Sequence, residues 1–359
     1  MSEIKIETIT SVHVGSGNFL QYNTDFFKGN IGQDNFLFVT DERKILAQIG
    51  EENLDNWVLS IEKGENTKDF VQRCNPKAKM SDYSKRALQL FGAIKPNDTL
   101  KEHIHDGMGR AYIPGSSIKG AIRSAVLATC INNIDDLESK IAKGRNVSAK
   151  QIEESLFGSM QSDVFRFLQV GDAFFKKDSE IAIRLTMALN ITQSKDLDSK
   201  YDRKPQVVEA IRPEEKSSFR INIDDRVKLP QHNAPLCLTN ISNLFAAINK
   251  HTKKLIIRDL DFWEDISDNY NGADNYIDSI KYILEEINYC KENECILRLG
   301  HGSGWDFITG GWARNLDNFD EVVVPASRPG NYKYEEYPFP KSRRLDTDSE
   351  MLGFVKLSF

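Results

Sequence analysis

Apolar and polar side chains alternate from Ile4 to Val14, at the start of the chain. A period of two predicts a strand with one buried face and one polar face. The polar face would carry Lys5, Glu7, Ser11 and His13, opposite Ile4, Ile6, Val12 and Val14. The strand runs into Gly15-Ser16-Gly17, which is a flexible stop for regular structure.

Apolar residues at helical spacing follow residue 112. Residues 112–113 end a short predicted strand, Pro114-Gly115 predicts a turn, and a helix is expected from Ser116 or Ser117. The apolar stripe of this helix is formed by Ile118, Ile122 and Val126 and continues to Ile131.

The remaining patterns predict strands and helices in both halves of the chain. The first half has a predicted hairpin at 35–39 and 44–49, helical insertions at 51–95 and 133–156, and paired strands at 165–175 and 181–189. A charged linker is expected at 194–206. The second half has predicted strands at 207–211, 218–224, 295–299 and 353–357, and helices at 236–250 and 273–291. These mixed halves are typical of an α+β protein with two domains, which we place at 1–205 and 206–359.

Composition narrows the class of protein. The 359 residues are 40% hydrophobic and 28% charged, and the formal net charge is -6. These values are typical of a globular protein and exclude a uniformly basic coat for nucleic acid, whereas a local basic groove is compatible with them. No apolar run approaches the roughly 20 residues that span a bilayer, and the alternating start is unlike a secretory signal.

The cysteines and histidines give little sign of a metal site. The five cysteines are scattered without CxxC spacing, which argues against a disulfide scaffold or a zinc site. His103 and His105 would share one face of a strand and offer two ligands, but a structural or surface role is favoured because no further ligand cluster is evident. We therefore expect a cytoplasmic protein without membrane association, metal or cofactor.

The start of the predicted helix has the features of an anion site. A helix that follows a tight turn at Gly115 presents free backbone N–H groups, and Ser116 and Ser117 add hydroxyl donors. A nucleotide-binding Walker A loop is excluded, because Ala121-Ile122 stand where its lysine and hydroxyl should be. The alternative is a capped core helix with a solvated basic face.

Three residues of the same helix are locally unfavourable. Lys119 and Arg123 lie four apart, where like charges cost about 0.2–0.5 kcal/mol. Gly120 costs about 1 kcal/mol relative to alanine. A phosphate backbone lying against the helix would use both cations and the missing side chain.

A glycine-rich stretch forms a second candidate site. Its residues are Gly300, His301, Gly302, Ser303, Gly304 and Trp305. Backbone without side chains allows a ligand to approach closely, and an indole is able to stack on a base. The alternative is a pair of tight turns between strands, with the tryptophan packed in the core.

Two further groups complete the candidates. Lys341, Arg343 and Arg344 lie in a C-terminal basic cluster that is interleaved with aromatic residues, a pattern that suits single-stranded nucleic acid but also an ordinary solvated loop. His13 and Asp25 flank the first glycine loop, where a histidine and a carboxylate near a phosphate would perform acid–base cleavage of RNA. Their alternatives are a strand residue and a turn residue.

Five segments of the chain carry a resemblance to a known family: 12–17, 113–123, 299–305, Pro340-Lys-Ser-Arg-Arg344 and 353–357. They resemble the RAMP superfamily of CRISPR-associated proteins, and they are most similar to the subunit at the head of type III-A (Csm) complexes. The resemblance implies two tandem ferredoxin-like, RRM-type domains with helical insertions. It implies a non-catalytic subunit that holds the 3′ part of the CRISPR RNA, contacts the Csm backbone subunit and the small helical subunit, and supports RNA maturation by recruiting nucleases.

The same resemblance assigns RNA binding to His13, to Gly15–Gly17, to Gly115–Arg123 and to Gly300–Trp305. Asp25 lies in the loop comparable to the one that carries the cleaving aspartate of the backbone subunit, so an endoribonuclease acting through Asp25 is one alternative. A RAMP subunit of a type III-B complex is the other. Because the predicted polar strand face lacks an aromatic pair, binding should be mostly to the RNA backbone and depend steeply on salt.

Overall fold

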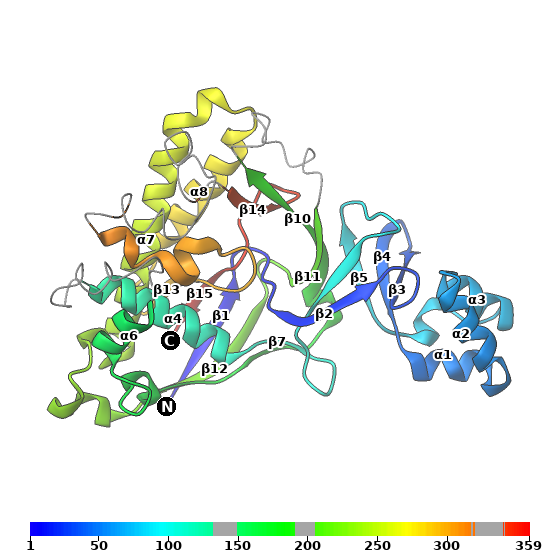
Figure 1. Cartoon of the computed structure of the whole chain (residues 1–359), viewed down its shortest axis with the longest axis horizontal. Coiled ribbons are helices and arrows are strands. Elements are labelled where there is room, and N and C mark those ends of the chain that lie inside the picture. The colour runs from blue at the N-terminus through cyan, green and yellow to red at the C-terminus, as the bar shows by residue number, and fades with distance from the viewer. Residues whose placement is uncertain (132–148, 191–204, 317–318, 320–339, 341) are drawn as a thin grey trace.

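The computed structural model describes residues 1–131, 149–190, 205–316, 319, 340 and 342–359 (Figure 1). Most of the predicted insertion at 133–156, most of the linker at 194–206, and Lys341 lie outside these residues. Within the described part of the chain, no helix is long and apolar enough to cross a bilayer.

The first sheet has five antiparallel strands in the order β13-β15-β1-β12-β8. Their bounds are β13 Glu294–Arg298, β15 Phe354–Ser358, β1 Ser2–Thr8, β12 Lys216–Ile223 and β8 Leu168–Val170. The alternation of β1 places Ile4 and Ile6 in the core, with no exposed surface, and leaves Lys5 exposed. This sheet therefore joins both ends of the chain around β1.

The second sheet has the strand order β2-β6-β11-β10-β5-β4-β3, and β14 pairs with β10. The bounds are β2 Gly15–Gln21, β6 Thr99–His103, β11 Gln206–Ile211, β10 Ile181–Asn190, β5 Ser84–Phe91, β4 Asp34–Thr40, β3 Phe26–Ile31 and β14 Ser342–Asp346. Strands β7 (Ala111–Ile113) and β9 (Ala173–Phe175) form a separate pair. Together with the helices, the two sheets confirm the predicted α+β class.

The helices form two groups in Figure 1. Helices α1 (Glu42–Ile49), α2 (Leu54–Glu62) and α3 (Thr67–Cys74) make a lobe at one end, next to β3 and β4. The others lie around the first sheet: α4 Gly115–Cys130, α6 Ala149–Phe157, α7 Ile241–Ile266 and α8 Ala273–Asn288.

Several element boundaries differ from the predictions. The expected strand at 44–49 is wrong, because Ile45 and Ile49 bury one face of helix α1, whose start is capped by the Asp41 carboxylate. The predicted strands at 165–175 and 181–189 do not pair with each other: β9 pairs with β7, and β10 pairs with β11. The helix expected at 236–250 continues to Ile266.

Each large sheet contains strands from both sides of residue 205. In the first sheet β1 pairs with β12, and in the second sheet β10 pairs with β11. The division into domains 1–205 and 206–359 stays a prediction, and both sheets are built across it.

The expected polar strand face is only partly present. Strand β1 ends at Thr8, and the following residues cross to the second sheet through a bridge between Val12 and Ile211. The expectation that Ser11 and His13 lie on an exposed face is wrong, because they are only 1% and 3% exposed. Their carbonyl oxygens accept hydrogen bonds from the C-terminal part of the chain.

Two glycines of α4 should respond oppositely to alanine. A Cβ on Gly115 would lie 2.2 Å from the carbonyl oxygen of Val170, whereas a Cβ on Gly120 would meet nothing within 4 Å. We expect Gly115→Ala to lower the free energy of unfolding by about 1–3 kcal/mol through overpacking. Gly120→Ala should raise it by about 0.5–1 kcal/mol through helix propensity. Urea unfolding of both variants measures this, and equal effects would contradict the described packing of α4.

Candidate nucleic-acid interface

The first predicted loop and the glycine-rich stretch meet at His13. The His301 N–H donates a hydrogen bond of 2.8 Å to the His13 carbonyl oxygen. A Cβ on Gly300 would lie 2.5 Å from that oxygen, so only glycine permits this crossing. The two imidazole rings lie edge to face, with centroids 5.5 Å apart. Residues that are far apart in the sequence therefore pack directly against one another.

The glycine-rich loop is a series of left-handed turns. Gly300, Gly302 and Gly304 have φ of 78°, 83° and 76°, a region that side chains disfavour. The Ser303 hydroxyl is turned inward and donates to the Gly300 carbonyl at 2.8 Å. The Trp305 ring packs closely on Gly310, which covers part of the indole, so stacking of Trp305 on a base stays a prediction.

The start of α4 is partly satisfied within the protein. The Gly115 N–H donates to the Asp172 carboxylate at 2.7 Å, and the Ser117 N–H donates to the Pro114 carbonyl at 2.9 Å. The Ser116 N–H and the hydroxyls of Ser116 and Ser117 have no hydrogen-bond partner in the described part of the chain. The helix start thus keeps a few free donors, but they lie next to the Asp172 carboxylate. Because this carboxylate repels anions, the predicted binding of an anion here requires nearby cations.

The two predicted cations of α4 differ in their surroundings. The Arg123 guanidinium pairs with Glu153 at 2.8 Å and with Asp163 at 2.9 Å, so its charge is largely used inside the protein. Lys119 forms no ion pair with any described residue, and burial lowers its pKa from 10.5. Of the pair, Lys119 is the cation available to an external phosphate.

Helix α4 and the segment after the glycine-rich loop lie side by side. The Ser124 hydroxyl donates a hydrogen bond of 2.9 Å to the carbonyl oxygen of Ile308. Figure 1 shows the same arrangement, with the orange segment along α4. The structure therefore brings together the sites predicted at α4, His13 and Gly300–Trp305.

A basic stripe on α7 was missed in the sequence. Lys250, Lys254 and Arg258 follow one another at intervals of four, which places them on one face of the helix. The predicted helix ended at residue 250, so it did not include Lys254 and Arg258. Its signal was the spacing of these three cations beyond that point.

The C-terminal basic cluster is mostly structural where it is described. The Arg343 guanidinium pairs with Asp259 of α7, and the Arg344 guanidinium donates to the Thr186 carbonyl at 3.3 Å. These contacts hold β14 against α7 and β10. RNA binding by Arg343 and Arg344 stays a prediction.

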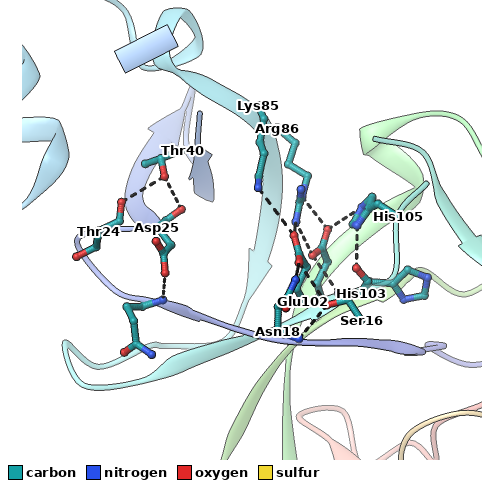
Figure 2. A network of polar contacts seen from close by, with 12 residues as sticks. Ser16, Asn18, Thr24, Asp25, Thr40, Lys85, Arg86, Glu102, His103 and His105 are labelled. Carbon is teal, nitrogen blue, oxygen red and sulfur yellow. Dashed lines mark hydrogen bonds and ion pairs between the residues drawn. The ribbon is translucent and has the colours of Figure 1, made fainter. Parts of the chain in front are cut away.

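A buried charge cluster supports the first glycine loop (Figure 2). The Arg86 guanidinium bridges Glu102, at 2.8 Å, and the fully buried Glu209, at 2.9 Å. Glu102 also accepts from the Ser16 hydroxyl at 3.3 Å and the Asn18 amide at 2.9 Å. The cluster thereby fixes the start of β2, where Gly15–Gly17 begin the strand.

The same cluster contains the one group of potential metal ligands found among the described residues. Oxygen and nitrogen atoms of Glu102, His105 and Glu209 lie within 4.8 Å of one another. The positive charge between these carboxylates is supplied by Arg86, and His105 Nε2 lies 3.2 Å from Glu209. The geometry is that of an ion-pair network.

Burial sets the charge states of the histidines. It lowers the pKa of His13 from 6.5 and those of His103 and His301 to about 3, so the three are neutral at pH 7. The His13 Nδ1–H then donates to the Glu209 carbonyl at 2.6 Å. Burial alone would raise the pKa of Glu209, but attraction to Arg86 and the hydrogen bond from His105 lower it to about 2.

Asp25 lies apart from this cluster in Figure 2. Its carboxylate accepts the Gln21 N–H at 2.7 Å, and its carbonyl accepts the Thr40 hydroxyl at 2.9 Å. The first contact closes the turn between β2 and β3, and the second ties that turn to the end of β4. Asp25 is therefore part of a turn, and catalysis by Asp25 stays a prediction.

The depressed pKa values make stability dependent on pH. The unfolded chain binds protons at its histidines near pH 6.5, but the folded chain resists them down to about pH 3 at His103 and His301. The contribution of these two groups is therefore fully present above pH 6.5 and is lost as pH drops, by up to about 1.4 kcal/mol per pH unit for each histidine. His301→Gln should flatten the curve between pH 6.5 and 4 in urea unfolding. An unchanged slope would contradict the burial of this imidazole.

Comparison with known proteins places this geometry in a family. The model of the RAMP superfamily matches residues 5–307. The Csm5 protein of Methanocaldococcus jannaschii is 26% identical over 197 residues, a match that covers 48% of this chain and 42% of that protein.

Two solved structures share the fold over the whole chain. A chain of a Csm–crRNA–target RNA ternary complex from a type III-A CRISPR-Cas system has a TM-score of 0.75, with 21% identity and 100% coverage of both chains. T. onnurineus Csm5 has a TM-score of 0.67, with 19% identity and coverage of 98% and 99%. The chain belongs to the RAMP superfamily and is similar to Csm5 in sequence and fold.

Proposed function

We propose that this protein is a non-catalytic subunit of a type III-A (Csm) effector complex, which caps the complex and holds the 3′ part of the CRISPR RNA. Likeness to a chain of a Csm–crRNA–target RNA complex over its full length supports membership of such a complex. The observation that carries the proposal is the meeting of α4, the glycine-rich loop and the first loop on one surface.

The available groups suit a sugar-phosphate backbone. Lys119 supplies a cation that forms no ion pair with any described residue, and Ser116 and Ser117 supply donors. Exposed Gly120 and Gly304 leave room for close approach. Contacts of this kind read charge and shape and carry no base sequence. A guide-holding subunit needs this tolerance, because guides differ in sequence.

The charge states favour holding RNA over cutting it. Neutral, buried His13 is used to hold the Glu209 carbonyl, and Asp25 is used to close a turn. Neither side chain faces an arrangement that moves a proton to or from a phosphodiester. We extend the proposal to partners: the Csm backbone subunit, the small helical subunit, and host nucleases that trim the RNA.

Lys119→Gln tests the RNA contact. Removing one phosphate contact should lower the RNA retained by the purified complex about two- to tenfold after a salt wash, and reduce the salt slope by about one. Arg123 is left intact, because its loss would also break the ion pairs with Glu153 and Asp163. The matched control is Lys63→Gln on the α1–α3 lobe, which should retain RNA normally. Equal retention by both variants would count against the proposal.

Asp25→Asn tests the absence of catalysis. The amide keeps the size of the side chain and an oxygen that accepts the Gln21 N–H. We therefore expect the assembled complex to cleave target RNA and to contain guides of the same length as before, as measured by gel analysis of both RNAs. Loss of cleavage with intact assembly would make the endoribonuclease alternative correct.

A further inference from the structure

A cavity of about 160 Å³ lies between α7, the glycine-rich loop and β14, and it borders the proposed RNA contacts at Gly304. Pockets for drug-sized ligands are larger, at about 300–1,000 Å³. The volume suits a group such as a phosphate. Residues that line it include Arg258, Phe262, Arg298, Ser303, Trp305 and Arg314.

The charged side chains in the wall do not cancel. The wall carries Arg258, Arg298, Arg314 and Arg343 together with Asp259 and Asp306. Arg343 pairs with Asp259, and Arg314 pairs with Asp306 at 2.7 Å. Two guanidinium groups, those of Arg258 and Arg298, remain as net positive charge.

Arg298 is held in a fixed position at the base of the glycine-rich loop. Its guanidinium donates to the carbonyl oxygens of Leu352, at 3.0 Å, and Gly302, at 3.1 Å, and the residue is 6% exposed. Burial lowers its pKa to about 10, so it stays charged at pH 7. A buried cation with carbonyl partners favours an anion nearby.

Arg258 has an unused donor. Its Nη1 atom is buried and has no hydrogen-bond partner among the described residues. Buried polar atoms in native proteins are normally paired, and an exception calls for a ligand or another explanation. A phosphate oxygen in the cavity would accept from Nη1 and neutralise the charge.

The basic stripe of α7 leads to this cavity. Lys250, Lys254 and Arg258 place one cation about every 6 Å along the helix axis. Like charges at this spacing destabilise an isolated helix, and the exposed face that carries the two lysines suits a polyanion that continues beyond the cavity.

We infer that the cavity takes a phosphate group of an RNA strand whose backbone follows the α7 stripe. The inference rests on the proposed function and deepens it, because it adds a second contact region beyond α4. The bound group is either an internal phosphodiester or a terminal phosphate of the RNA. Both present a phosphate with an attached nucleoside.

The test is binding of single-stranded RNA to the full chain, freed of RNA, as measured by fluorescence anisotropy at several salt concentrations. Arg258→Gln should weaken binding about tenfold and reduce the salt slope by about one, the value for one phosphate contact. Arg258→Lys keeps the charge and should recover the slope. Lys63→Gln is the control and should bind like the unaltered chain. Melting curves show that each variant is folded.

Two RNAs of one sequence, with a 3′-hydroxyl or a 3′-phosphate, identify the source. If Arg258→Gln loses the same affinity for both RNAs, the cavity binds an internal phosphodiester. If it loses affinity only for the 3′-phosphate RNA, the cavity binds the terminal phosphate. Unchanged affinity and salt slope in Arg258→Gln would overturn this inference and leave the proposed function standing. The same conclusion holds if Arg258→Gln binds RNA normally but no longer binds a Csm partner protein. No RNA binding by the unaltered chain would overturn the proposed function as well.

Discussion

The structure depends on a direct contact between the backbone of an N-terminal segment and the backbone of two C-terminal glycine turns. The segment Thr10–Val14 crosses two glycine turns of the C-terminal half, at Gly300 and Gly353. The Gly353 N–H donates to the Ser11 carbonyl at 3.0 Å, and the His301 N–H donates to the His13 carbonyl at 2.8 Å. A Cβ on Gly300 would lie 2.5 Å from the His13 carbonyl oxygen, so the crossing requires glycine there and fixes the glycine-rich loop relative to both sheets.

This crossing has an electrostatic consequence. It buries His13 near Arg86 and Glu209, whose ion pair lies in the interior of the second sheet. Removing one partner of a buried ion pair leaves an unpaired charge, which is strongly destabilising. The loops of the proposed RNA surface are therefore held by a rigid support of paired charges.

The net charge of -6 conceals how the cations are used. Arg86, Arg123 and Arg343 are paired with carboxylates inside the protein. Lys119 and Arg258 are not ion-paired with any described residue. Cations without an ion pair to any described residue, such as Lys119 and Arg258, give an acidic protein local positive charge that is able to bind a polyanion.

Local signals in the sequence predicted the α+β class, most strands and the turns of the glycine-rich loop, since periodicity and glycine spacing act over a few residues. The flexible stop expected at Gly15–Gly17 and the helical insertion expected at 51–95 are partly wrong, because strands β2 and β5 form there by pairing with strands distant in the sequence. The same signals located the start of α4 and the glycine-rich loop. They missed contacts over long sequence separations, such as Arg123 with Asp163 and Gly115 with Asp172, because nothing local specifies the partner. The burial of His13 was missed for the same reason.

Lysine footprinting of the assembled complex tests the central claim most directly. Acetylation of Lys119, Lys250 and Lys63 is compared by mass spectrometry before and after nuclease digestion of the RNA. The account predicts that Lys119 and Lys250 are protected only while RNA is present and that Lys63 is unaffected by it. Equal reactivity of Lys119 and Lys250 in both states would contradict an RNA strand on this surface.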